Sequence, residues 1–233
     1  MHRHVVKVPL AAVTEVGTST TWLAAEPAVE RQRLDADSWV DVVRGLVPRA
    51  DEVHDDLIEQ VRWEPSQVFR YDRWMDEPRL AGYQDGDRHP ALVEVGTWLS
   101  RRYRVNFGGA GLVRYRNERD SVGFHRDREL RWLEDTLIGV LTLGAHRPWL
   151  VRPLTNGRRA DPDDDDMTDV LDFSPASGDL LVMGGRCQAA WLHAVPKSRE
   201  RCRDRIGAQW RWTSRRGRRD PNPSYYAPRH YSR

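Results

Sequence analysis

The stretch "RIGAQWR", residues 205–211, decides the fold. Arg205 and Arg211 are six positions apart, so along an extended strand both side chains point to the same face. The opposite face carries apolar side chains: Ile206, Ala208, Trp210 and Trp212. This alternation predicts a strand with one face in a core. If the arginine face looks into a barrel, each guanidinium needs an anion, because a buried unpaired charge is very costly. The alternative is an exposed edge strand with solvated arginines.

Other short strands precede this one. They are branched or aromatic and are bounded by Gly, Pro or Asp: residues 136–143, 148–154 and 179–185. Two amphipathic helices are predicted earlier, over residues 49–62 and 90–104. The segment "SWVDVVRGLV", residues 38–47, is compatible with a further short helix. Several short strands after two helices predict an antiparallel sandwich or jelly roll with helices packed on one side.

Composition indicates a globular chain with an uneven charge distribution. Of the 233 residues, 39% are hydrophobic, 31% are charged and ten are tryptophan, while the net charge is only +2. Residues 199–219 carry nine arginines, whereas residues 158–172 carry seven aspartates; the run "ADPDDDDMTD", residues 160–169, is expected to form a loop between strands. Such asymmetry can orient a protein on a polyanion, because phosphate contacts supply much of non-specific nucleic-acid affinity. The alternative for most of these charges is a solvated surface.

The cysteine count and the absence of long apolar runs predict the compartment. Cys187 and Cys202 are the two cysteines, and we expect both to be free thiols in a reducing compartment. No stretch approaches the roughly 18 apolar residues that a membrane span requires. The apolar start is interrupted by Lys7 and Pro9, so it makes a poor signal peptide. We expect a cytoplasmic monomer with no membrane partner.

A His-x-Asp motif, His125 and Asp127, lies in the stretch "SVGFHRDREL". Residues i and i+2 of an extended segment project to the same side. Two imidazoles and one carboxylate on one face of a metal, with the other positions open, are the ligand set of non-haem iron(II) oxygenases. His193 in "WLHAVP" follows strand-like sequence and is the best candidate for the second imidazole. The alternatives are charged residues on a solvated surface and, for His193, a hydrogen-bonded core histidine.

Four stretches carry a family resemblance: "LVRYRNERDSVGFHRDRE" (112–129), "LIGVLTLGAHRPWLVRP" (137–153), "GDLLVMGGRCQAAWLHAVP" (178–196) and "RIGAQWRW" (205–212). In this order they resemble the AlkB-type alkylated-nucleobase dioxygenases, which are iron(II)- and 2-oxoglutarate-dependent oxygenases. The resemblance covers about residues 46–213. It implies a mainly β double-stranded β-helix (a jelly roll) with supporting helices and a nucleotide-recognition region. Residues 1–45 would be an N-terminal extension and residues 214–233 a basic C-terminal tail.

The resemblance also implies a metal and co-substrate site. The iron(II) ligands would be His125, Asp127 and His193. The residues that would bind 2-oxoglutarate are Arg205, Arg211 and Tyr115. In this arrangement Arg205 would pair with the far carboxylate of 2-oxoglutarate, and Arg211 would lie nearer the metal and the substrate. Val113 departs from the family, which commonly has Asn two residues before the tyrosine, so one amide contact to the co-substrate is missing.

Substrate residues follow from the same resemblance. Glu129 matches an acidic residue that touches the exocyclic amine of the damaged base, and a carboxylate there favours a cationic methylated base. Tyr83 in "RLAGYQ" is a weaker candidate for stacking on the base, and Trp74 is weaker still. Arginines that could contact phosphate lie at positions 101, 102, 104, 114, 116 and 119 and in the tail.

The implied activity is oxidative dealkylation of N-methylated bases in DNA or RNA, of the 1-methyladenine or 3-methylcytosine type, which is alkylation damage repair. Dioxygen and 2-oxoglutarate would be consumed and formaldehyde released. Two other classes stay open. One is an oxygenase with the same core that acts on a protein or a small molecule, and the near-neutral charge is compatible with it. The other is a non-catalytic nucleic-acid-binding module, for which Val113 is the one indication.

Overall fold

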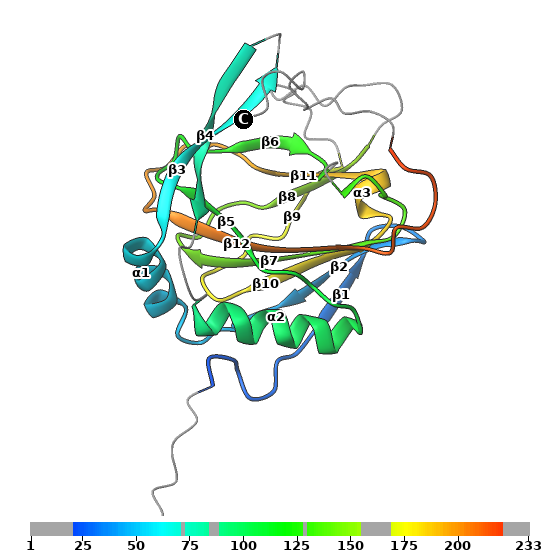
Figure 1. Ribbon diagram of the computed structural model, residues 1–233, viewed down its shortest axis with the longest axis horizontal. Coiled ribbons are helices and arrows are strands. Elements are labelled where there is room, and N and C mark those ends of the chain that lie inside the picture. The colour runs from blue at the N-terminus through cyan, green and yellow to red at the C-terminus, as the bar shows by residue number, and fades with distance from the viewer. Residues whose placement is uncertain (1–20, 71–72, 84–88, 128–129, 155–168, 221–233) are drawn as a thin grey trace, which may run out of the picture.

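Two antiparallel β-sheets lie face to face and form the body of the molecule (Figure 1). The computed structural model describes residues 21–70, 73–83, 89–127, 130–154 and 169–220. The larger sheet has eight strands in the order β1 (Glu30–Arg33), β2 (Ser38–Val43), β10 (Leu180–Gly185), β7 (Thr136–Gly144), β12 (Arg205–Thr213), β5 (Gly111–Tyr115), β4 (Arg73–Tyr83) and β3 (Arg62–Arg70). The smaller sheet has four strands in the order β6 (Val122–His125), β11 (Trp191–Val195), β8 (Leu150–Pro153) and β9 (Leu171–Asp172). This two-sheet arrangement confirms the predicted jelly roll.

Side chains of the large sheet alternate between two cores. In β7, Leu141 packs into the core beneath the helices, whereas its neighbour Val140 packs into the core between the sheets. Strand β12 alternates in the same way: Ile206, Ala208 and Trp210 are fully buried on the helix side. Arg205 on the same strand is also buried, but it faces the pocket between the sheets. The alternation predicted for residues 205–211 is therefore confirmed.

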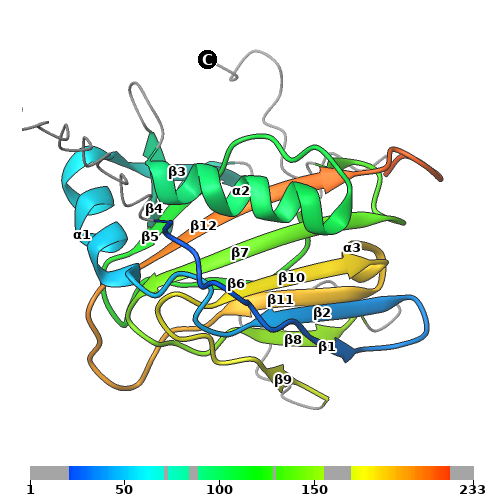
Figure 2. The same cartoon turned by 90° about the horizontal axis from the view of Figure 1, so that it is seen from below.

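Two helices support the large sheet on the side away from the small sheet (Figure 2). α1 (Ala50–Gln60) and α2 (Pro90–Tyr103) match the two predicted helices within two residues at each end. Pro90 begins α2, and the Nδ1 atom of His89 accepts a hydrogen bond from the Ala91 backbone NH, which caps the helix. Gly96 lets the helix approach the sheet closely, since a Cβ at this position would lie 3.0 Å from the Trp210 indole nitrogen.

The segment from residue 38 to residue 47 is not a helix. Residues 38–43 form β2, which pairs with β10 inside the large sheet. Val40 and Val42 pack between the sheets, whereas Val43 packs on the helix side, so the segment is buried on both faces. A strand buried on both faces reads as a continuous apolar run and loses its alternation, which explains the wrong prediction. β1 and β2 both lie in the stretch that sequence analysis set apart as residues 1–45.

A long hairpin made of β3 and β4 stands at the edge of the large sheet (Figure 1). Only Leu80, Ala81 and Gly82 of β4 pair with β5, so the remainder of the hairpin extends beyond the sheet. The Ser121 backbone NH donates to the Pro78 carbonyl at 2.8 Å and ties the hairpin to the start of β6. Among the described helices, including the one-turn α3 (Cys187–Ala190), none has the length and apolar character needed to cross a bilayer.

Candidate metal and co-substrate site

His125, Asp127 and His193 meet at one end of the space between the sheets. The antiparallel register of β6 and β11 places His125 directly opposite His193, with ring centroids 4.2 Å apart. Asp127 follows β6 by two residues, and the ligand atoms of all three side chains lie within 4.8 Å of one another. The structure thus brings together the three residues that the sequence predicted as metal ligands.

Hydrogen bonding fixes which nitrogen of His125 faces the other two ligands. Its Nδ1 lies 2.9 Å from the Gly123 carbonyl, which can only accept, so Nδ1 carries the proton and donates. The Nε2 atom therefore faces the other two ligands and lies 3.5 Å from Asp127 Oδ1. His193 Nε2 lies 3.7 Å from the same oxygen. A backbone carbonyl that orients a histidine through its second nitrogen is the usual support for a metal ligand.

Asp127 divides its two carboxylate oxygens between different partners. Oδ2 accepts a hydrogen bond from Arg211 Nε at 2.6 Å, while Oδ1 faces the two histidines. The Asp127 backbone NH donates to Oε1 of the fully buried Gln188 at 2.8 Å. Burial alone would raise the pKa of Asp127, but the nearby Arg211 charge outweighs it and holds the pKa well below its usual range. The carboxylate is therefore ionised and oriented.

The donor set fits a divalent transition metal. Burial, followed by the nearby His125, lowers the pKa of His193 to about 3, so its imidazole is neutral at physiological pH. The His193 Nδ1 atom is buried and has no hydrogen-bond partner among the described groups. Two imidazoles and one carboxylate on one side, with the pocket on the other, match the two-histidine, one-carboxylate set that suits iron(II).

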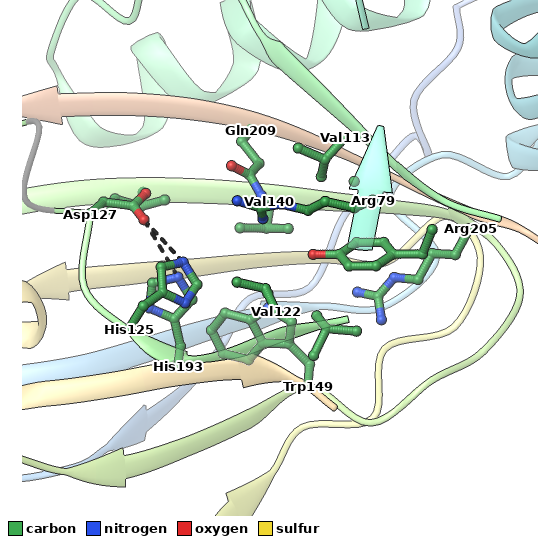
Figure 3. Close-up of a pocket in the computed structure, with 14 residues that line it drawn as sticks. Arg79, Val113, Val122, His125, Asp127, Val140, Trp149, His193, Arg205 and Gln209 are labelled. Atoms are coloured by element: carbon green, nitrogen blue, oxygen red, sulfur yellow. Dashed lines mark ion pairs between the residues drawn. The ribbon is translucent and has the colours of Figure 1, made fainter. Parts of the chain in front are cut away.

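A pocket of about 390 Å³, part of it open to solvent, extends from the metal ligands between the sheets (Figure 3). Its far end holds Arg205, which is 1% exposed. The Arg205 guanidinium donates to Thr142 Oγ1 at 3.0 Å and to the Arg147 carbonyl at 3.3 Å, and its Nε has no partner among the described groups. Burial lowers the pKa of Arg205 to about 10, and the described residues form no ion pair with it. A carboxylate that entered the pocket would give this buried guanidinium an ion-pair partner.

Tyr115 and Arg211 lie beside these groups in different ways. Tyr115 is the cross-strand partner of Arg205, is 2% exposed and lines the pocket, as expected for a co-substrate contact. Arg211 lies at the metal end, where its Nε donates to Asp127 Oδ2 at 2.6 Å; its contact with the co-substrate stays a prediction. Val113, the departure from the family, also lines the pocket.

The structure adds pocket residues that sequence analysis did not identify. Trp149 packs against the His193 ring with centroids 5.7 Å apart. Arg79 reaches the pocket from β4 and pairs with Glu77 at 3.0 Å. Burial acts to lower the pKa of Arg79, but Tyr115 and Glu77 raise it above its usual value, so the side chain stays charged. Gln209 lies on the pocket face of β12, two residues before Arg211. The alternation along residues 205–211 that identified the two arginines also places Gln209 on their face of the strand.

The structure describes only some of the residues predicted to contact the substrate. Glu129 and residues 160–168 of the aspartate-rich loop lie outside the described residues. Tyr83 ends β4, but its side chain is not described. Trp74 lies on the extending part of the hairpin and is 42% exposed.

The arginines proposed for phosphate contact fall into two groups. Arg101, Arg102 and Arg104 lie at the end of α2, on the side of the large sheet away from the pocket (Figure 2). Three others already have carboxylate partners: Arg114 with Asp204 at 2.9 Å, Arg116 with Asp120 at 2.7 Å and Arg119 with Glu118 at 3.7 Å. Phosphate contact by these arginines stays a prediction, as it does for the arginines of the tail, where residues 221–233 lie outside the described part of the chain.

A family model and several known proteins match this chain. The family model described as the 2OG-Fe(II) oxygenase superfamily matches residues 7–219. The chain is 28% identical over 179 residues to the alpha-ketoglutarate-dependent dioxygenase alkB homolog 3 of Bos taurus, covering 70% of this chain and 61% of that protein. It is 27% identical over 183 residues to the Homo sapiens protein of the same name, covering 71% and 62%. The chain thus spans about three fifths of the length of these curated relatives. A Pseudomonas putida prolyl-4-hydroxylase structure aligns with a TM-score of 0.48 and 16% identity, covering 76% of this chain and 93% of that one.

Proposed function

The chain belongs to the 2OG-Fe(II) oxygenase superfamily, and on this basis we propose that it is an iron(II)- and 2-oxoglutarate-dependent dioxygenase that demethylates nucleic-acid bases. One observation carries the proposal: a pocket between the sheets has the His125, Asp127 and His193 set at one end and the buried guanidinium of Arg205 at the other. A dicarboxylate with a keto group at one end could bind the metal through that end and Arg205 through its far carboxylate.

Each end of the pocket has its own task in binding. The imidazoles of His125 and His193 and the Asp127 Oδ1 oxygen would hold iron(II), which supplies the oxygen-activating chemistry when bound. Arg205 would pair with the carboxylate far from the keto group. Arg211 holds Asp127 Oδ2 and thereby leaves Oδ1 to the metal. Trp149 and Val140 line the pocket and make part of its wall apolar.

The proposed substrate is an N-methylated base of the 1-methyladenine or 3-methylcytosine type. Overall, 2-oxoglutarate, dioxygen and the N–CH3 group would become succinate, carbon dioxide, formaldehyde and N–H. A base stacked in a duplex cannot reach a pocket between two sheets, so the base must be flipped out or come from a single strand. The β3–β4 hairpin supports this proposal, because it joins the pocket through Arg79 and presents the exposed Trp74 beyond the sheet. Exposed aromatic side chains commonly stack on single-stranded bases.

Mass measurement of defined oligonucleotides tests the proposal. Single-stranded oligonucleotides with one 1-methyladenine or one 3-methylcytosine would be incubated with the protein, iron(II), ascorbate and 2-oxoglutarate under air. We expect loss of one methylene mass from the methylated strands only, and no change with Asp127→Ala. No mass change on either lesion would contradict the nucleic-acid assignment. If succinate still formed in that case, the alternative oxygenase of proteins or small molecules would be favoured.

A further inference from the structure

The pocket wall between Arg205 and the metal ligands has a cross-strand pair without polar side chains. Val113 of β5 lies directly opposite Gly207 of β12, and both line the pocket. A Cβ at position 207 would lie only 3.3 Å from Val113 Cγ2, so little more than a hydrogen fits there. This pair therefore offers the co-substrate no side-chain hydrogen bond.

Gln209 is the next residue of β12 that faces the pocket. Figure 3 shows its side chain between Asp127 and Val113, directed into the pocket. Its Nε2 atom lies 3.9 Å from the position that a Cβ of Gly207 would occupy. The Gln209 amide thus lies beside the position that a side chain at residue 207 would occupy.

Arg211 determines which way the Gln209 amide is turned. The Nη2 atom of Arg211 hydrogen-bonds to Gln209 Oε1. An arginine can only donate, so the oxygen must face Arg211 and the NH2 group must face elsewhere. The same guanidinium holds Asp127 through Nε at 2.6 Å, so the Gln209 amide is coupled to a metal ligand through one rigid group.

We propose that Gln209 binds the co-substrate: its Nε2–H donates a hydrogen bond to the carboxylate next to the keto group of 2-oxoglutarate. This inference rests on the proposed function. Gln209 is four residues from Arg205, roughly 13 Å along a strand, and two residues from Arg211, so it serves the metal end of the pocket. It supplies the amide that Val113 lacks, from the neighbouring strand.

Binding of 2-oxoglutarate to the full chain loaded with manganese(II), measured by calorimetry without nucleic acid, tests this role independently of turnover. Gln209→Leu removes the donor and is expected to weaken binding by about tenfold or more, as for loss of a hydrogen bond to a charged group. Gln209→Glu keeps an acceptor for Arg211 but places an oxygen against the carboxylate, so it should weaken binding at least as much. Gln32→Leu makes the same change on the exposed strand β1 and should have no effect.

A rescue variant separates the lost donor from altered packing. Val113→Asn combined with Gln209→Leu returns an amide from the opposite strand and should recover most of the lost affinity. The role of Gln209 would be overturned if Gln209→Leu or Gln209→Glu bound 2-oxoglutarate as tightly as wild type, or if the double variant recovered no affinity. The proposed function would still stand in that case. Failure of the wild-type chain to bind 2-oxoglutarate would overturn the proposed function, and this inference with it.

Discussion

His125 and His193 are direct cross-strand partners, and the β6–β11 register sets their ring centroids 4.2 Å apart. Backbone hydrogen bonds between two strands therefore position both imidazoles. The carboxylate between them is fixed separately, by Arg211 on its side chain and by Gln188 on its backbone NH. Because each ligand has its own support in the fold, we infer that the site is shaped before a metal binds.

Asp127→Asn tests the charge of the carboxylate ligand. The amide keeps the size of the side chain but removes the negative charge that the metal and Arg211 share. We expect manganese(II) affinity to fall by at least about a hundredfold. Mutating a residue that only supports a metal ligand already lowers metal affinity by about 10- to 100-fold, and changing the ligand itself should lower it no less. Metal content per chain after dialysis measures this, with the exposed Asp37→Asn as the matched control. Equal metal content in Asp127→Asn and wild type would remove Asp127 from the ligand set.

Gln188→Leu tests the backbone support of the same ligand. Gln188 is fully buried, and its Oε1 accepts from the Asp127 NH at 2.8 Å. Without this acceptor a buried NH is left unsatisfied, which costs about 1–3 kcal/mol of stability. We expect a lower thermal midpoint and a metal affinity reduced by about tenfold. A variant as stable as wild type and with unchanged metal affinity would show that this hydrogen bond does not position Asp127.

Arg205→Met separates folding from co-substrate binding. The substitution removes a buried charge that has no carboxylate partner among the described residues, so the metal-loaded protein without 2-oxoglutarate should be no less stable than wild type. A ligand stabilises a protein only insofar as it binds the folded state. The rise in thermal midpoint that 2-oxoglutarate gives wild type should therefore be lost. If the rise persisted in Arg205→Met, the far carboxylate would have to bind elsewhere.

The two cysteines should differ in reactivity. Burial raises the pKa of the Cys187 thiol to about 12, and its Sγ donates to the Trp39 carbonyl at 3.3 Å, whereas Cys202 is partly exposed. The thiolate is the reactive form, so Cys187 should be inert at pH 8. With a chromogenic disulfide reagent we expect one thiol to react in the folded protein and two in denaturant. Rapid reaction of two thiols in the folded wild type, or of the one remaining thiol in folded Cys202→Ser, would contradict the buried position of Cys187.

Sequence periodicity identified the parts of the fold with one buried face, and failed elsewhere. Strand β12 and helices α1 and α2 have one apolar face each, which gives a clear period. β2 is buried on both faces and was mistaken for a helix. The β3–β4 hairpin was missed because Pro65 and Pro78 interrupt charged, weakly alternating strands. Arg79 was missed with it.

The metal ligands could be predicted, whereas their partners could not. His125 and Asp127 are two positions apart, and residues with this spacing in an extended segment point to the same side. The partnership of Arg211 with Asp127 depends on how β12 lies against the end of β6, and no local pattern reports that contact. The orientation of Gln209 follows only once that pair is known.

Simultaneous measurement of formaldehyde and succinate is the most direct test of the central claim. The chain would be supplied with iron(II), 2-oxoglutarate, air and a methylated single-stranded oligonucleotide, next to the same oligonucleotide without the methyl group. With the methylated strand, we expect one formaldehyde and one succinate for each repaired base. With the unmethylated strand, we expect succinate to form far more slowly. Succinate formed at the same rate with both strands, and no formaldehyde with either, would contradict the central claim.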